Sequence, residues 1–552
     1  MLDLKPEVDT VEYSERETIE QNHGRHHHHH HHDVVVQGNE DEPGSVYQLS
    51  WKTIIAFISL SMANSCAALA NTANTVIKFQ VASVAKSPAD AALASWIANG
   101  SFLVVLALGP IFGSLSDRVG KKWFMVCGAI LGLIGSVIAG KAENILQIIG
   151  GNILNGAANA GCIVSISAIQ EIIPNRLRPW AMGASQAMAS AFVVLGTFLA
   201  AAFVKMNAGG AGGWRWAYYF NSIIYGITAV MIAFSYFPPR PRLGRHKMLN
   251  SITKEIDYIG ILLMSGSFAS LILGITWGGT THPWSSGQCI GTLTAGCIGL
   301  LIFGLYEAFV VTEGIFDHRL FETMNFPILL FVCTIDGMLL LGVNVLYAQE
   351  IFDLFTTDAV RIAVILSPFL ITSAFGCIPA GWVMASTKSF RWMLVGSLFW
   401  CALFTGLMAM VTSTRLPMAL AFTTLFGLGT AVTTTIPAVA LGLSVPAFLI
   451  GTAATVSISC RALGGIIGIT IFTAIYDNKY AELVGPEIAA NTNAPVLVNE
   501  SAEAWKYVWI AVASLVAANG VAACFLKSVA PMMNHHVESA LEPSKLREAQ
   551  LS

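Results

Sequence analysis

The sequence predicts an all-α polytopic membrane protein with fourteen transmembrane helices. Of the 552 residues, 55% are hydrophobic and only 11% are charged, whereas a soluble domain carries about 25% charged residues. Apolar runs of about 20 residues, long enough to cross a bilayer, recur along the whole chain. Short polar loops separate these runs, and their Lys and Arg residues indicate which side of the membrane each loop faces.

The first fifty residues are polar and acidic, so we expect no signal peptide and a first span that begins near Trp51. Fourteen apolar runs then follow in order. They cover approximately residues 52–74, 93–115, 123–140, 145–168, 183–204, 216–236, 257–276, 288–311, 326–348, 360–384, 392–412, 417–441, 448–475 and 505–526. An even number of spans places both termini on the same side of the membrane.

The Lys and Arg residues favour termini in the cytoplasm. This topology puts 20 of them on the inner side and nine on the outer side, with Arg461 inside a span. The densest inner cluster, Pro239 to Lys254, reads as a linker. We therefore predict a cytoplasmic tail (1–50), a six-helix bundle (51–238), a cytoplasmic linker (239–256), an inserted helix pair (257–311), a second six-helix bundle (312–530) and a cytoplasmic tail (531–552).

One short loop, GSLSDRVGKK from Gly113 to Lys122, lies between two apolar runs. Ten residues cannot cross the membrane, so both flanking helices must end on the cytoplasmic face. Gly113 permits close backbone approach and Gly120 permits a turn. Asp117 can accept hydrogen bonds from a helix N-terminus or pair with Arg118. The segment 376–392 looks like a degraded second copy, which indicates an internal repeat.

The spacing Gly-x-Leu-Ser-Asp-Arg-x-Gly-Lys-Lys resembles the loop between helices 2 and 3 of the major facilitator superfamily. Five further segments resemble the fungal fourteen-span drug:proton antiporters, and most of all the fungal trichothecene efflux pump group: Trp214–Asn221, Asp257–Gly260, Trp277–Gly279, His282–Ser286 and Arg461–Gly468. The resemblance covers about residues 45–530. It implies the major facilitator fold in a 6 + 2 + 6 arrangement and a cytoplasmic gate at Gly113, Asp117, Arg118, Gly120, Lys121 and Lys122.

Three positions depart from the antiporter pattern. Asn152 stands where these proteins carry an arginine, four residues before Gly156. Residues 52–74 contain no carboxylate, although antiporters usually carry one in the first helix. The sequence Leu195-Gly196-Thr197 lacks the proline of the usual helix 5 bend. The resemblance therefore implies proton antiport, but the residues that antiporters usually carry at these three positions are absent.

Two ionisable residues fall near the middle of predicted spans, Asp336 in 326–348 and Arg461 in 448–475. A charge in hydrocarbon costs about 2.5–3.5 kcal/mol on insertion scales, so each demands an explanation. A carboxylate in a cavity-lining helix can bind and release a proton as the cavity changes sides, which makes Asp336 a candidate for proton coupling. The alternative is an Asp336–Arg461 ion pair that only neutralises two buried charges.

Asparagines form polar faces on two predicted helices. Asn71 and Asn74 share one side of the first helix with helical spacing, near Asn64, and Asn152, Asn155 and Asn159 share one side of the fourth. We favour a hydrogen-bonding wall of the substrate cavity, suited to a neutral polyoxygenated compound. The alternative is amide bonding between helices that holds the bundle together.

Several other residues receive simpler interpretations. Glu171, Glu307, Glu350 and Asp353 lie near span ends and are expected to be solvated, with a local salt bridge near Arg176 for Glu171. The ten cysteines suggest neither disulfides nor zinc ligation, and His26 to His32 form a low-complexity run with no assigned role. Asn499 in the predicted outer loop 477–503 is a glycosylation candidate.

The leading hypothesis is a secondary transporter that exports small amphipathic organic compounds, such as toxins, drugs or secondary metabolites, by proton antiport. Uptake of a siderophore or nutrient, or a membrane sensor that no longer transports, are the alternatives. The sequence contains no GxxxxGK[ST] loop and no catalytic triad spacing, so an ATP-driven pump or an enzyme is disfavoured. We expect no cofactor, metal or nucleic acid, and a monomer in the plasma membrane or in a vacuolar or vesicle membrane.

Overall fold

A computed structural model describes residues 50–77, 96–206, 213–238, 257–278, 282–311, 318–321, 323–446, 449–490, 494–529 and 533. The His26 to His32 run, both tails beyond these ranges and the linker 239–256 lie outside the described residues. Within these ranges the fold is all-helical, and fourteen of the described helices are long and apolar enough to cross a membrane. The predicted fold class and the number of spans are therefore confirmed.

The first six spans are α1 (Trp51–Ile77), α3 (Trp96–Val119), α4 (Lys121–Gly140), α5 (Ile145–Ile172), α6 (Arg178–Lys205) and α7 (Arg215–Ser235). A helix pair follows, α9 (Tyr258–Trp277) and α10 (Gly287–Phe309). After the short 3₁₀ helix η2 (His318–Phe321), the remaining spans are α11 (Asn325–Gly337) with η3 (Met338–Gly342) and α12 (Val343–Leu354), α13 (Ala359–Thr387), α14 (Arg391–Met408), α15 (Leu416–Ser444), α16 (Ile450–Ala490) and α17 (Ala494–Ala523).

The ninth span is interrupted near its middle. A π-helical segment, η3, separates α11 from α12, so the two helices form one span of 30 residues, Asn325–Leu354. A π-segment widens the backbone turn, weakens the regular hydrogen-bond ladder and is often found at functional sites. Asp336 lies just before η3 and Asn344 just after it. The interruption therefore lies between two polar positions of the span.

The packing of the first six spans is repeated by the last six. The neighbours α1 and α6 correspond to α11 and α16, while the pairs α3 and α5, α4 and α5, and α4 and α7 correspond to α13 and α15, α14 and α15, and α14 and α17. Across the two sets, α3 packs on α16 and α6 packs on α13. These contacts are those expected of an internal repeat, and the six-two-six boundaries of the domains stay a prediction.

Glycines bring the helices of the two sets into close contact. A Cβ atom at Gly113 of α3 would overlap the hydroxyl of Thr455 on α16, and one at Gly381 of α13 would overlap the carbonyl oxygen of Pro179 on α6. Small residues let backbones approach closely, which is how transmembrane helices gain packing energy where lipid gives no hydrophobic drive.

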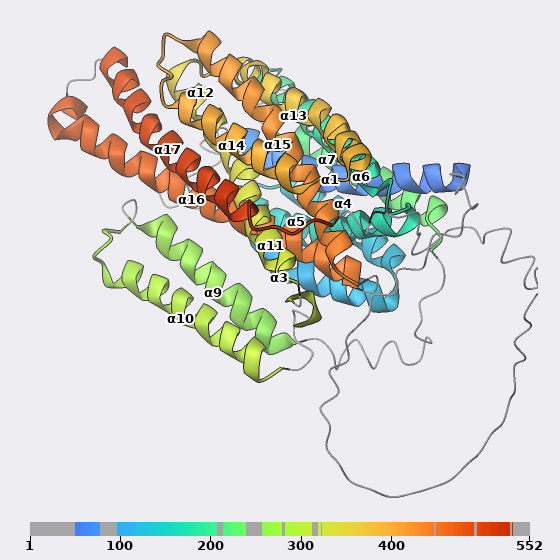
Figure 1. The fold of residues 1–552 in the computed structure, drawn as a ribbon. Helices are drawn as coiled ribbons and strands as arrows, with labels where there is room; N and C mark the ends of the chain where they lie inside the picture. The colour runs from blue at the N-terminus through green and yellow to red at the C-terminus, as the bar shows by residue number, and fades with distance from the viewer. Residues whose placement is uncertain are drawn as a thin grey trace, which may run out of the picture. The chain divides into compact units, whose positions relative to one another are not determined.

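The helix pair α9 and α10 packs mainly on itself, and α9 also contacts α3 and α16 (Figure 1). Most of the α10 surface is exposed, including Leu301 and Leu305. Large apolar side chains on an exposed face suit contact with lipid.

Two predicted loops are shorter than expected because helices extend into them. Most of the segment Gly113 to Lys122 is helical, and the chain turns at Gly120 alone, whose φ of 109° favours glycine. Outside residues 491–493, the predicted loop 477–503 is helical, because α16 and α17 extend beyond their apolar cores. Asn499 consequently lies in α17 with an exposed side chain rather than in a loop.

We expect Gly381→Ala to lower thermal stability, because its Cβ would overlap backbone that cannot move without shifting α6. Overpacking of this kind costs about 1–3 kcal/mol. The measurement is the temperature at which half of the detergent-solubilised protein is no longer monodisperse. Gly396→Ala on α14 is the matched control, because its added Cβ meets no atom within 4 Å. Equal melting temperatures for the two variants would contradict the close crossing.

Candidate functional site: a cavity between the two helix sets

A cavity of about 180 Å³ lies between the two sets of helices. Its walls come from α1, α3, α5 and α6 on one side and from η3, α12, α13, α15 and α16 on the other. Most of the lining is apolar, including Phe102, Ile163 and Leu341. The polar lining consists of Asn64, Asn159, Gln186, Ser190, Asn344, Ser373, Thr434 and Arg461. An apolar cavity with a few polar groups is the usual form of a small-molecule site.

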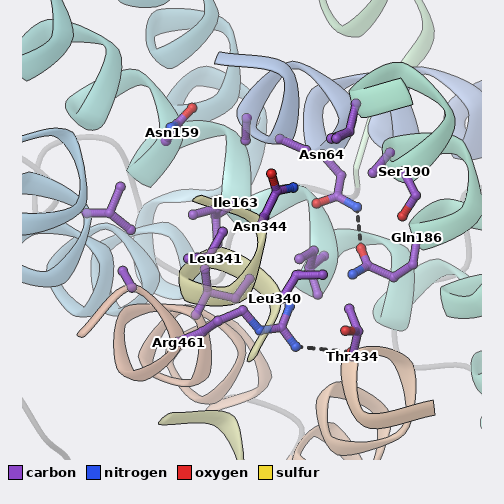
Figure 2. A pocket seen from close by; sticks show the side chains of 18 of the residues that line it. Asn64, Asn159, Ile163, Gln186, Ser190, Leu340, Leu341, Asn344, Thr434 and Arg461 are labelled. Carbon is purple, nitrogen blue, oxygen red and sulfur yellow. Dashed lines mark hydrogen bonds between the residues drawn. The ribbon is translucent and has the colours of Figure 1, made fainter. Parts of the chain in front are cut away.

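Amides supply much of the polarity of this cavity. Asn64 on α1 donates to the Gln186 carbonyl on α6 at 2.5 Å, and Asn159 on α5 accepts from the Tyr225 hydroxyl at 2.8 Å. Figure 2 shows Asn344 extending from the other helix set into the same space as Asn64. An amide carries both donors and acceptors. The cavity can therefore hydrogen-bond an uncharged compound from opposite walls.

Arg461 is the charged residue in the cavity wall, and its partner lies behind it. An Arg461 guanidinium nitrogen lies 2.8 Å from Oδ2 of Asp336, whose side chain is fully buried and does not line this cavity. Arg461 also donates to the Thr434 carbonyl at 3.1 Å (Figure 2). The ion pair is therefore formed, with only its cationic member facing the cavity.

Threonine hydroxyls of α15 hydrogen-bond the Asp336 oxygen that does not face Arg461. The Thr433 hydroxyl donates to Oδ1 of Asp336 at 2.6 Å, and the Thr434 hydroxyl lies 3.3 Å from the same atom. Contact between α11 and α16 at Gly337 brings the pair together, because a Cβ there would overlap the Arg461 carbonyl oxygen. A buried ion pair needs such additional donors to offset the cost of removing both charges from water.

The asparagines predicted to line the cavity occupy different sites. Asn159 does line it, but Asn152 and Asn155 are buried away from it. Asn152 donates to the Tyr218 hydroxyl at 3.0 Å, and Asn155 accepts from Ser136 at 3.1 Å. These two form the interhelical amide bonds that were the alternative interpretation. The side chains of Asn71 and Asn74 lie outside the described residues.

Sequence reasoning missed Gln186 and Asn344 as lining residues. Each is a single amide in an apolar run, with no second amide at helical spacing on the same face. The useful signal for Asn344 is its position eight residues after Asp336 in the same predicted span.

Asp117 connects the two helix sets at the end with the basic loops. One of its carboxylate oxygens accepts from the Thr452 amide at 2.8 Å and from the Thr452 hydroxyl at 3.1 Å. Thr452 lies in the first turn of α16, whose unpaired amides and positive dipole end favour a carboxylate. Of the two predicted partners of Asp117, the structure shows the helix N-terminus.

Lys121 anchors the same carboxylate from its own side. Its ammonium nitrogen lies 2.9 Å from Asp117 and also pairs with Glu171 at the end of α5. The principal contact of Glu171 is therefore Lys121 and not Arg176. The prediction that the Glu171 carboxylate is solvated was wrong. Lys122 instead lies over the Phe237 ring, 3.6 Å from its centroid, and Arg118 is half-buried.

Glu350 and Asp353 are also more enclosed than predicted. The Glu350 side chain is buried, and its Oε1 accepts from the Trp509 indole at 3.2 Å. Asp353 accepts from the Trp505 indole at 3.2 Å and from Gln349 at 3.0 Å. The expectation that these carboxylates are solvated was wrong because α17 extends over α12. No group of three or more metal-ligating side chains occurs among the described residues.

The fold identifies the class of protein. It matches the proton:xylose symporter XylE bound to 6-bromo-6-deoxy-D-glucose, with a TM-score of 0.55 and 14% identity over 83% of this chain and 94% of that chain. It also matches the human organic anion transporter MFSD10 (TETRAN), with a TM-score of 0.53 and 13% identity over 85% of this chain and all of that one. The chain therefore has the major facilitator fold.

The family follows from the sequence matches. Residues 30–504 match the fungal trichothecene efflux pump (TRI12) family model, so the chain belongs to that family. It is 28% identical to the efflux pump FUS6 of Gibberella fujikuroi over 462 residues, which are 81% of this chain and 79% of the relative. It is 25% identical to the trichothecene efflux pump TRI12 of Fusarium sporotrichioides over 378 residues, 67% of this chain and 62% of that protein.

Replacement of Asp117 by Ala is expected to open the end of the bundle that carries the basic loops, because α16 loses its carboxylate partner. Spin labels are placed at the exposed positions Leu177 and Ser389, one in each helix set. Opening should appear as a population of longer distances between the labels in double electron–electron resonance. Glu143→Ala, which removes an exposed acid at the opposite end of α4, is the control. Identical distance distributions in all three proteins would exclude a closing role for Asp117.

Proposed function

We propose that the protein exports small, amphipathic, uncharged organic compounds, such as toxins or secondary metabolites, in exchange for protons. Membership of an efflux pump family supports export. The cavity supports the class of compound, because its walls are apolar with amides on opposite sides and no carboxylate in the described lining. The main support for proton exchange is the Asp336–Arg461 pair, of which only the arginine faces the cavity.

Protonation of Asp336 is the proposed coupling step. One proton binds the carboxylate and removes its charge, and no covalent bond to carbon changes. Arg461 then loses its ionic partner and needs other acceptors, since an unpaired buried cation is costly. The polar lining of the cavity that Arg461 faces, which includes Asn344, offers such acceptors. The freed guanidinium and the substrate therefore compete for the same amides, so proton binding expels substrate.

The contact of Asp117 with α16 supports alternating access. It holds the two helix sets together at the end predicted to face the cytoplasm, so the cavity opens to that side only when the contact breaks. We place both termini in the cytoplasm and the protein, as a monomer, in the plasma membrane. The excess of Lys and Arg on the inner side supports this orientation.

Direction of transport is tested in a yeast strain that lacks its own drug pumps. Expression of the protein should lower accumulation of a radiolabelled trichothecene and should not raise accumulation of a labelled ferric siderophore. Raised siderophore accumulation would instead establish uptake. No change in either compound, with protein present at the plasma membrane, would contradict export of this class.

Asp336→Asn should abolish proton-driven efflux of the labelled trichothecene, because an amide cannot exchange the proton. The measurement compares efflux from vesicles with and without an imposed pH gradient. Asp358→Asn is the matched control, since Asp358 lies outside the cavity in a partly exposed pair with Lys205 at 3.6 Å, and its N-terminal cap on α13, a bond from the Val360 amide, can also be made by asparagine. Gradient-driven efflux by correctly localised Asp336→Asn protein would exclude coupling through this residue.

Asn344→Ala should weaken substrate binding without removing the response to the pH gradient. One hydrogen bond contributes about 0.5–1.5 kcal/mol, so the apparent affinity for the trichothecene should fall by up to about tenfold. Asn478→Ala is the control, because that amide is exposed and bonds only its own helix. Equal affinities for the two variants would show that Asn344 does not contact the substrate.

A further inference from the structure

Glu350 is a buried carboxyl group that the proposed coupling step does not use. It lies on α12 with its side chain 1% exposed. Its Oε1 accepts from the Trp509 indole of α17 at 3.2 Å, and its Oε2 is buried with no hydrogen-bond partner among the described residues. Asp336 differs, because an arginine and two threonine hydroxyls surround it.

Among the described residues, no positive charge compensates Glu350. Its titratable neighbours on its own helix are Asp353 and Tyr347. Tyr476 of α16 faces Asp353, and α17 presents the Trp509 indole. No basic side chain forms an ion pair with Glu350 in the described part of the chain. An unpaired ionised carboxylate in such a place would cost several kcal/mol, so the group is neutral while it is buried.

Glu350 lies where a bend in its helix would expose the carboxyl group to water. It follows the π-segment η3 by eight residues, on the half-helix whose Asn344 lines the cavity. The half-helix ends at Leu354, at the end of the bundle opposite the Asp117 contact. A π-segment is a point at which a helix can bend. Bending there would separate Glu350 from Trp509 and admit water to the carboxyl group.

We propose that Glu350 is a second proton-binding site of the transport cycle. The carboxylate takes one proton from the outer solution as α12 docks on α17, and it releases that proton to water when α12 moves away. A proton bound at Glu350 thus permits the outer end to close, whereas Asp336 governs binding in the cavity. The role in the cycle rests on the proton antiport proposed above, but protonation of Glu350 does not depend on it.

Infrared difference spectroscopy of the purified protein in lipid tests the protonation directly and needs no substrate. Glu350→Gln keeps an oxygen acceptor for Trp509 and should remove one carbonyl band of a protonated carboxylic acid at neutral pH. Asp353→Asn is the matched control on the same helix and should retain that band. Retention of the band in Glu350→Gln, or its loss only in Asp353→Asn, would overturn the proposal.

Transport then tests the role of the proton. Efflux of the labelled trichothecene by Glu350→Gln should depend less on external pH than efflux by the native protein, because closure of the outer end no longer requires a proton while Asp336 still does. Asp353→Asn should keep the native dependence. An unchanged external pH dependence in Glu350→Gln would overturn the role. If the native protein moves no trichothecene, the proposed function fails, while the infrared result still decides whether Glu350 holds a proton.

Discussion

Close contact between helices at glycines is the constraint on which the site depends. Gly337 lets α11 approach the backbone of α16, and only at that separation can Asp336 reach Arg461. Gly451, in the first turn of α16, lies against the Asp117 carboxylate in the same way. One helix, α16, therefore supplies both the cation of the cavity and the N-terminus that closes one end of the bundle. A movement of α16 necessarily alters both contacts.

Much of the fold could be predicted from the sequence because lipid imposes a simple rule. Each span must be apolar for about 20 residues, so runs such as 216–236 matched α7 closely. Helix ends were harder to predict, because polar helical turns outside the apolar core carry no hydropathy signal. For that reason the sequence predicts a loop from Gly113 to Val119, although these residues continue α3.

The sequence predicted residues of the candidate site only where a charge within an apolar span required an ionic partner. Asp336 and Arg461 stood out because isolated charges in apolar spans are costly, and pairing was one of two interpretations. Helical spacing alone grouped Asn152 with Asn159, although one contacts Tyr218 and the other lines the cavity. Spacing reports a shared helix face, but it does not report which neighbouring helix that face meets.

The interrupted span explains how two buried acids can have different electrostatic surroundings on one helix. Before η3, Asp336 is fixed by a cation across a glycine contact. After η3, Glu350 packs among apolar and aromatic side chains with a single indole donor. A continuous rigid helix would move both acids together, so neither environment could change without the other. The π-segment removes that constraint, because a bend at Met338–Gly342 can expose the second acid while the ion pair of the first stays intact.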